Sequence, residues 1–259
     1  MKKILFLFLF SIFLFQSCKK EDSFTEAITS DIIMSLEEEI DSTGNTFEIK
    51  CANEKIYNCS NFGIQTNYII VGKDINIEFE KIITSEICQT ATGATTSRIN
   101  LDNLENGAYN IDIKVGNKNN TGKLVVSDHS FNIEIKNLNG LQLERNPLLR
   151  IPKNTIWGLI GYHANNTENL AQSYIDSLQI LGATNANLSE GDYGYFTTNT
   201  SWDIIEPTGH GYWFSIPYAF KYSNDMEILK NLIKNYKINY SDSVSINLYS
   251  SEGDHFWAY

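Results

Sequence analysis

Hydrophobic and polar residues follow three different patterns along this chain. Residues 4–15 are all apolar except Ser11. Between residues 47 and 150, apolar and polar residues alternate in several short segments, which is typical of β-strands with one solvated face. Beyond residue 151, two segments have apolar residues three and four positions apart, as helices do. The pattern therefore divides the chain into an apolar leader, a β-rich part and a mixed part.

The alternating part predicts antiparallel β-structure. The segments DINIEFEKI, NIDIKV and FNIEIK place an apolar residue at every second position, and turn signals at 71–73, 116–120 and 137–140 flank them. Solvated faces and frequent turns are typical of β-sandwiches. The segment LENGAY, which ends at Tyr109, resembles the tyrosine corner of immunoglobulin-like sandwiches, where a tyrosine hydroxyl binds the preceding chain. We expect residues 47–150 to form an all-β, immunoglobulin-like sandwich.

The last part of the chain predicts two helices among four strands. The segments TENLAQSYIDSLQILG and NDMEILKNLIKNYK have helical spacing, and those around Trp157, Tyr193, Pro217 and Ile246 indicate strands. The order β-α-β-β-α-β is that of a ferredoxin-like unit. Pro217 lies in a strand that this topology places centrally, so that it requires a bulge or a different topology. We expect residues 151–259 to form a ferredoxin-like α+β domain, and the chain to have two globular domains.

An acidic segment precedes the β-rich part. Residues 21–46 hold eight acidic side chains and no basic one. Apolar residues recur four positions apart from Phe24 to Ile40, which is helical spacing. However, three consecutive glutamates at 37–39 would lie near the C-terminal end of that helix, where acidic residues are disfavoured. We expect residues 18–46 to be an acidic tether that is either marginally helical or flexible.

The first 17 residues predict a secretory signal. Two lysines precede the apolar run, which is shorter than the roughly 20 residues of a membrane-spanning helix. Residues 14–18, LFQSC, resemble the lipobox of bacterial lipoproteins, in which the cysteine receives lipid and becomes the first mature residue. The resemblance implies removal of residues 1–17, lipid attachment at Cys18 and anchoring to a membrane through the acyl chains. The alternative is an ordinary signal peptide with a chance cysteine.

The residues after Cys18 indicate where such a lipoprotein would lie. The segment KKED at 19–22 resembles the export tag of surface lipoproteins of the Bacteroidetes. The segments CSNFGI, ICQTATGAT, NLENGAYNI, WGLIGYH and GDYGYF resemble uncharacterised, flavobacterial-type outer-membrane lipoproteins of that phylum. The resemblance implies an envelope location and no particular activity. We expect a lipid-anchored protein of the outer membrane and favour the cell surface over the periplasmic face.

Three cysteines would remain besides Cys18. Export places them in an oxidising setting, where disulfides form. We favour a disulfide between Cys59 and Cys88, because each lies at the edge of a predicted strand and the bond would close a long loop. The resemblance to the Bacteroidetes lipoproteins implies the same pair. A disulfide between Cys51 and Cys59 is the alternative, and no histidine lies near enough in the sequence to suggest zinc.

The charge and the motif content exclude several functions. Removal of residues 1–17 would leave 18 basic against 31 acidic side chains, which disfavours a nucleic-acid partner. The chain contains no G-x-S-x-G segment, P-loop or dinucleotide-binding fingerprint. We expect no catalytic residues, no metal and no cofactor, and therefore a protein that is not an enzyme.

The mixed part contains a candidate ligand patch. In a ferredoxin-like sheet, aromatic residues and two histidines would gather at one end, where rings supply contact area and imidazoles hydrogen bonds. The residues of this patch are His210, His255, Trp157, Trp213, Trp257 and Tyr212. The alternative, which we prefer, is that the aromatic rings cover the sheet face that meets the other domain.

Three functions fit these expectations. The first is a non-enzymatic envelope protein that binds or assembles with an envelope or extracellular protein or a glycan. The second is a protease inhibitor or a chaperone-like accessory, since ferredoxin-like units also occur as protease propeptides. The third is an envelope hydrolase, which would need two acids or a nucleophile and a base within hydrogen-bond reach.

Overall fold

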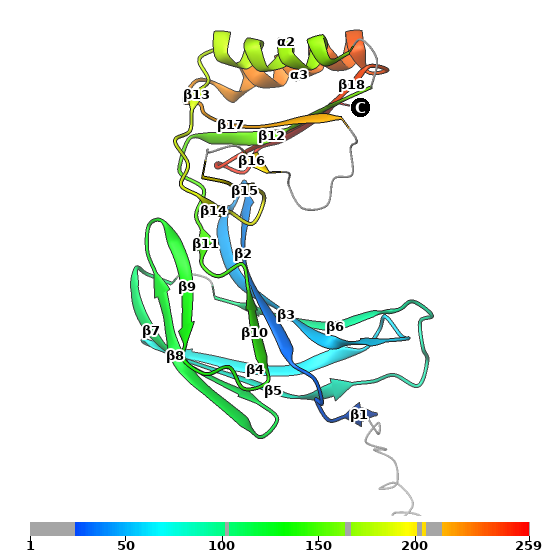
Figure 1. Ribbon diagram of the computed structural model, residues 1–259, viewed down its shortest axis with the longest axis vertical. Coiled ribbons are helices and arrows are strands. Elements are labelled where there is room, and N and C mark those ends of the chain that lie inside the picture. Colours follow the sequence, from blue (N-terminus) through cyan, green and yellow to red (C-terminus); the bar gives the residue numbers. More distant parts are fainter. Residues whose placement is uncertain (1–23, 102–103, 164–166, 201–203, 206–213, 259) are drawn as a thin grey trace, which may run out of the picture.

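Two β-sheets organise the chain, as Figure 1 shows for the computed structural model. The structure describes residues 24–101, 104–163, 167–200, 204–205 and 214–258. Within these residues, a large curled sheet has 14 strands and a small sheet has five, with two helices packed on one face of the small sheet. Neither of these helices is long and apolar enough to cross a membrane.

The large sheet contains strands from the N-terminal and the C-terminal parts of the chain. Its spatial order is β10 (Leu141–Glu144), β2 (Ile32–Asp41), β3 (Gly44–Tyr57), β6 (Gly93–Asn100), β4 (Gly63–Val71), β5 (Asp74–Ile83), β7 (Gly107–Val115), β8 (Lys118–Val126), β9 (Ser130–Ile135), β11 (Leu148–Leu149), β14 (Gly191–Asp192), β15 (Thr197–Thr198) and β16 (Ile204–Ile205). A short strand, β1 (Thr25–Glu26), pairs with the end of β5.

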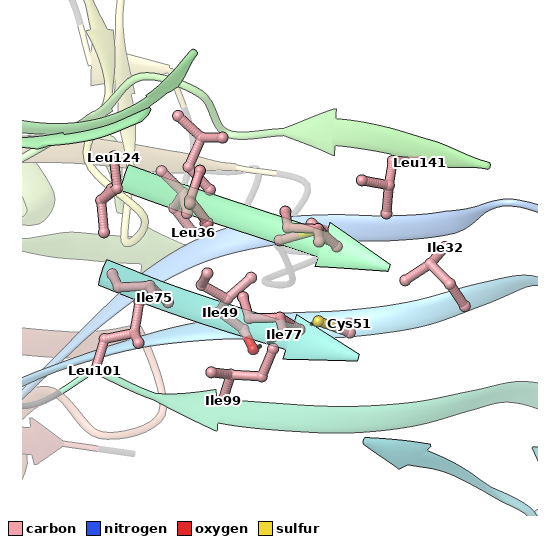
Figure 2. Close-up of a cluster of buried hydrophobic side chains, with 14 of the residues drawn as sticks. Ile32, Leu36, Ile49, Cys51, Ile75, Ile77, Ile99, Leu101, Leu124 and Leu141 are labelled. Atoms are coloured by element: carbon pink, nitrogen blue, oxygen red, sulfur yellow. Dashed lines mark hydrogen bonds between the residues drawn. The ribbon is translucent and has the colours of Figure 1, made fainter. Parts of the chain in front are cut away.

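The large sheet curls around its own hydrophobic core. Alternate residues of its strands point to the inside, and Ile49, Ile77 and Ile99 are among those that Figure 2 shows there. Phe47 of β3 stacks on Phe131 of β9 with 3.8 Å between ring centroids, although these strands are far apart in the sheet order. Each fully buried isoleucine or phenylalanine contributes about 1.5–3 kcal/mol relative to an exposed one. Burial of one face of every strand therefore favours the curled form over a flat sheet.

The prediction of an immunoglobulin-like sandwich is wrong. The strands form one curled mixed sheet, and β10–β2, β4–β6, β5–β7 and β11–β14 pair in parallel. The local corner is present, because the Tyr109 hydroxyl donates to the Glu105 carbonyl at 2.9 Å. Alternation decides which side of a strand is buried, but it does not decide which strand becomes its neighbour. A corner of five residues is compatible with either arrangement.

The small sheet carries both helices. Its order is β13 (Thr184–Asn185), β17 (Ser215–Lys221), β12 (Thr155–Tyr162), β18 (Val244–Ser250) and β19 (His255–Ala258). The helices are α2 (Glu168–Ile180) and α3 (Met226–Tyr240), which begins where the Asp225 side chain accepts the amide of Glu227. Tyr174, Leu229 and other apolar residues of the helices pack against one sheet face and form a second core.

The prediction of a ferredoxin-like domain is also wrong. The strand expected around Tyr193 does not join the small sheet, because Gly191–Asp192 and Thr197–Thr198 form β14 and β15 of the large one. Directly after α2, only the two residues of β13 join the small sheet. An additional strand, β19, lies at the opposite edge. Pro217 helps to explain why β13 is short. On one side of β17, Pro217 pairs with Leu159 of β12. On the other side, β13 pairs only with Lys221 and Phe220 and does not extend to Pro217. A proline that lacks an amide hydrogen is tolerated in a strand with one unpaired side.

The expected tether is largely part of the sheet. Residues 32–41 form strand β2, in which Ile32, Met34, Leu36 and Glu38 are buried in alternation. A spacing of four is a multiple of two, so the apolar residues that suggested a helix fit a strand equally well. Met34 and Glu38 occupy the intervening inward positions and complete the strand pattern. Residues 18–23 lie outside the described residues, as does the leader.

Candidate functional site

The predicted aromatic patch is assembled only in part. His210, Tyr212 and Trp213 lie outside the described residues. Trp157 lies in a cross-strand row on the small sheet, between Ala219 of β17 and Tyr249 of β18, and this row continues to His255 of β19. The row occupies the face opposite the helices, because Ile156 and Leu248, which alternate with it, belong to the helix-covered core.

Trp157 belongs to a third hydrophobic core, which we call the inter-sheet cluster. This cluster contains Ile151, Trp157, Leu188, Tyr193 and Phe196, with Ile40 of β2, Tyr195 and Tyr249 packed against it. Trp157 is 2% exposed, and its ring centroid lies 5.2 Å from that of Tyr195. The Ile40 amide donates to the Tyr195 hydroxyl at 2.9 Å and so joins the tip of β2 to this segment. Trp157 therefore packs between the sheets and offers no surface to a ligand.

His255 ends this row at the edge strand β19, and Trp257 lies two residues further along the same strand, opposite Asn247. The His255 ring stacks on Tyr249 with 4.2 Å between centroids, and Trp257 lies 5.2 Å from His255 with 51% of its surface exposed. Partial burial lowers the pKa of His255 below its usual 6.5. Neither His255 nor Trp257 lines the two cavities described below. The described half of the patch is thus an aromatic stack at a sheet edge.

The cysteine prediction is confirmed. Cys59 and Cys88 form a disulfide that joins the end of β3 to the loop between β5 and β6. Cys51 is a free thiol in the core of the large sheet, which excludes the alternative pair of Cys51 and Cys59. Burial raises the pKa of the Cys51 thiol to about 12. Cys18 lies outside the described residues.

Two adjoining cavities lie on the outer face of the large sheet. One has a volume of about 520 Å³ and crosses β4, β5, β7 and β8, and the other has a volume of about 1050 Å³ and crosses β5, β7, β8 and the end of β9. They share Asp112, Asn119, Asn120 and Thr121. The outward positions of these strands line them, because the alternating residues Ile77 and Ile113 are buried in the core. We call the two cavities together the outer groove.

Strand register arranges the outward side chains of the groove in three rows. In the first, Glu78 of β5 faces Lys114 of β7, and their charged groups lie 2.6 Å apart. In the third, Asp74 of β5 faces Asn110 of β7, whose amide donates to it at 2.7 Å. The first and third rows are therefore largely occupied with contacts of their own.

The middle row differs from the rows beside it. Asn76 of β5 faces Asp112 of β7, which faces Thr121 of β8. Among the described residues, no hydrogen bond or ion pair is found for the side chains of Asn76, Asp112 and Thr121, and all three are exposed. An amide, a carboxylate and a hydroxyl are thus available side by side, with neighbouring strands about 4.8 Å apart.

A buried asparagine fixes one wall of the groove. The Asn120 side chain is 3% exposed, donates to the Asn139 carbonyl at 3.1 Å and accepts the Asn139 amide at 2.7 Å. It also donates to the Ile113 carbonyl at 3.3 Å. These bonds hold the loop after β9 against the start of β8. The wall is therefore rigid before any ligand binds.

The outer groove was not predicted from the sequence. DINIEFEKI and NIDIKV were predicted to be strands, and they are β5 and β7. Their parallel pairing, with β6 placed elsewhere in the sheet, was not predicted. Only that pairing brings Asn76 next to Asp112. One signal in the sequence could have indicated the site. Asparagine, aspartate and threonine occupy outward strand positions, although lysine and glutamate there would be sufficient for solubility.

The remaining chemistry of the described residues is limited. No group of three or more histidine, cysteine or carboxylate side chains that could hold a metal ion is found among them. The residues that line the outer groove include no histidine, cysteine or serine. Comparison of the chain with protein-family models, with curated proteins and with solved structures found no match. The function of the protein therefore has to be inferred from the geometry of its site.

Proposed function

We propose that this protein is a non-enzymatic, lipid-anchored binding protein of the bacterial outer membrane and that the outer groove is its binding surface. The anchor part rests on the LFQSC segment and on lipid attachment at Cys18. The binding part rests on one observation, the middle row of Asn76, Asp112 and Thr121. Its side chains have no hydrogen-bond partner among the described residues, while Glu78 pairs with Lys114 and Asp74 accepts from Asn110 in the rows beside it.

The chemistry of the groove favours binding over catalysis. Acid–base or nucleophilic catalysis needs two reacting groups within hydrogen-bond reach of each other. Asp112 has a neighbouring amide and a neighbouring hydroxyl, but no histidine or second unpaired carboxylate in its row. Such a row can orient a ligand through hydrogen bonds. The proposal of a protease inhibitor is not retained, because it depended on a ferredoxin-like unit.

Thiol protection tests the groove without knowledge of the ligand. Lys123→Cys would place a reactive thiol in the groove without altering the middle row, and Thr96→Cys would place one at an exposed position of β6 outside both cavities. Both variants are made in the chain from Lys19 onwards. The native cysteines contribute no background, because Cys59 and Cys88 are in a disulfide and Cys51 is buried.

The probe is an aqueous extract of Bacteroidetes envelopes pooled with dextran, mannan and xylan. We expect it to slow maleimide labelling of the Lys123→Cys variant several-fold and to leave the Thr96→Cys variant unchanged. Equal labelling rates with and without the probe at both positions would refute the groove as a binding surface.

The anchor has a separate test. Cells that express the full chain are fed radiolabelled palmitate and fractionated, in parallel with cells that express Cys18→Ala. We expect label and membrane association for the unaltered chain and loss of both for the variant. Membrane-bound, labelled Cys18→Ala protein would show that residue 18 is not the attachment site.

A further inference from the structure

The outer groove has the chemistry of a site for uncharged, hydroxyl-rich ligands. Amide side chains both donate and accept hydrogen bonds, and carboxylates accept them, so the two together match hydroxyl groups, which do both. Asn76, Asp112 and Thr121 offer all of these functions in one row. Asn119, in the neighbouring row, adds a further exposed amide.

The charge of the groove is nearly balanced, in contrast to the protein as a whole. The chain has a formal net charge of −11. The groove, however, contains Lys114, Lys123 and Lys136 beside the carboxylates of Asp74, Glu78, Asp112 and Glu134. A polyanion would be repelled by Asp112, which has no cation in its row. A polycation would be repelled by the three lysines. A neutral ligand is repelled by neither.

The extent of the groove favours a chain of several units over a single small molecule. Together the two cavities cross β4, β5, β7, β8 and β9, and four strand spacings of about 4.8 Å give a length of roughly 19 Å. At the β4 end, Ile69 faces Asn76 of β5, is 58% exposed and lines the smaller cavity. Exposed apolar side chains beside hydrogen-bonding groups suit sugar rings, which have both apolar faces and hydroxyl edges.

A peptide fits the groove less well. Extended peptides bind by adding a strand to a sheet edge, where backbone groups are unpaired. The groove lies on the face of the sheet, and each strand from β5 to β8 is paired on both sides. No edge of backbone donors and acceptors is therefore available at this place.

We infer that the outer groove binds a neutral oligosaccharide and that Asn76, Asp112 and Thr121 hold its hydroxyl groups. This inference rests on the function proposed above and names the ligand class of the same site. Ile69 contacts an apolar face of a sugar ring at one end of the groove. The ligand is recognised as it is, with no bond made or broken.

The chemical class of the ligand is tested by dividing the same extract and polysaccharide pool into three arms. One arm is left intact, one is digested with proteinase K, and one is oxidised with periodate, which cleaves the vicinal diols of sugars. We expect the intact and digested arms to slow labelling of the Lys123→Cys variant several-fold and the oxidised arm to have no effect. Protection that survives periodate and is lost with proteinase K would overturn the glycan inference while supporting binding at the groove.

Variants then test the middle row. Binding of the digested arm to the immobilised chain is measured by interferometry for the unaltered chain, Asp112→Ala and Asp242→Ala. Asp242 is an exposed carboxylate after α3, outside the groove, and serves as a matched control. We expect at least a ten-fold loss of affinity for Asp112→Ala, because hydrogen bonds to a charged group are among the strong ones, and no change for Asp242→Ala. Unchanged affinity of an Asp112→Ala protein that melts like the unaltered chain would overturn the assignment of the row.

Discussion

Arg150 holds the carboxylate of Glu38 with two donors, although 112 residues separate them in the chain. The guanidinium atoms Nη2 and Nε lie 3.0 and 3.2 Å from the same Glu38 oxygen. The Glu38 residue is 6% exposed, and the guanidinium also lies 4.9 Å from the ring centroid of Phe131. The pair ties β2 to the segment that leads from the large sheet into the small one. This ion pair explains why Glu38, an acidic residue, can be buried on the inner side of β2.

Loss of Arg150 is expected to be costly. In Arg150→Met, the Glu38 carboxylate would stay buried without a cation, and we expect the free energy of unfolding to fall by about 2–4 kcal/mol, as measured in urea. The matched control is Lys230→Met, which removes an exposed ion pair with Glu227 and should cost less than about 1 kcal/mol. The double variant Glu38→Met with Arg150→Met should recover part of the loss, because no unpaired charge remains. Equal effects of the two single variants would contradict this account of Glu38.

Strand β2 illustrates which structural features could be predicted from the sequence and which could not. Alternation predicted the strands between residues 47 and 150 and which of their faces are buried, because that property is local to each strand. The burial of Glu38 could not be predicted, since the partner that neutralises it comes from the other side of the molecule. The same limit applied to the sheet as a whole. Parallel pairing of β5 with β7 depends on where β6 goes, and β6 pairs with β3.

In the candidate site, too, local features could be predicted and contacts between distant segments could not. The Cys59 and Cys88 pair was predictable, because strand edges and loop length are visible in the chain. Trp157 and His255 do lie on one small sheet, but the inter-sheet cluster that buries Trp157 includes Tyr193 and Phe196, which were expected in a strand of that sheet. It also includes Leu188, for which nothing was predicted. The outer groove was not predicted, because its rows exist only once four strands have taken their register.

The disulfide is expected to stabilise the large sheet. It closes a loop with a sequence separation of 29 residues, for which loss of unfolded-state entropy predicts a stabilisation of about 3–4 kcal/mol. We expect the double variant Cys59→Ala with Cys88→Ala to lose about this amount in urea unfolding. A reductant should lower the unfolding midpoint of the unaltered chain and leave that of the double variant unchanged. A reductant effect of the same size on both proteins would show that the stabilisation has another source.

Cys51 should be chemically inert in the folded protein. Thiol alkylation requires the thiolate, and burial raises the pKa of this thiol to about 12, so that little thiolate forms at pH 8. We expect iodoacetamide at pH 8 to modify no cysteine of the native chain from Lys19 onwards and one cysteine after unfolding without reduction. Mass spectrometry of the intact chain reads out both results. Rapid labelling of Cys51 before unfolding would contradict its place in the core.

Gly158 should tolerate no side chain. A Cβ atom at this position of β12 would overlap the carbonyl oxygen of Asn247 in β18 and approach the Tyr218 hydroxyl to 3.0 Å. That hydroxyl donates to the same Asn247 carbonyl at 2.9 Å and lies 3.0 Å from the Tyr174 hydroxyl, so it has little freedom to move. We expect Gly158→Ala to lower the free energy of unfolding by about 3 kcal/mol or more.

Gly63 provides the matched control for Gly158. It also lies in a strand, but no heavy atom lies within 4 Å of the place where its Cβ would be. Gly63→Ala should change stability by no more than about 1 kcal/mol, with a gain expected because alanine restricts the unfolded chain. Thermal unfolding of both variants measures the contrast. Similar losses for the two alanines would mean that β12 and β18 are less closely packed than the structure shows.

His255 should make the stability of the small sheet depend on pH. Burial lowers the pKa of its imidazole in the folded state below 6.5, so the folded protein favours the neutral ring stacked on Tyr249. The stability that this provides is fully present above the unfolded value of about 6.5 and is lost as the pH falls through the lower folded value. We expect a histidine titration followed by NMR to give a midpoint below 6.5 for His255. In His255→Phe, which keeps a ring against Tyr249, the difference in melting temperature from the unaltered chain should change in favour of the variant as the pH falls below 6.5. A His255 midpoint above 6.5, or a melting-temperature difference that stays constant with pH, would show that burial does not control this ring.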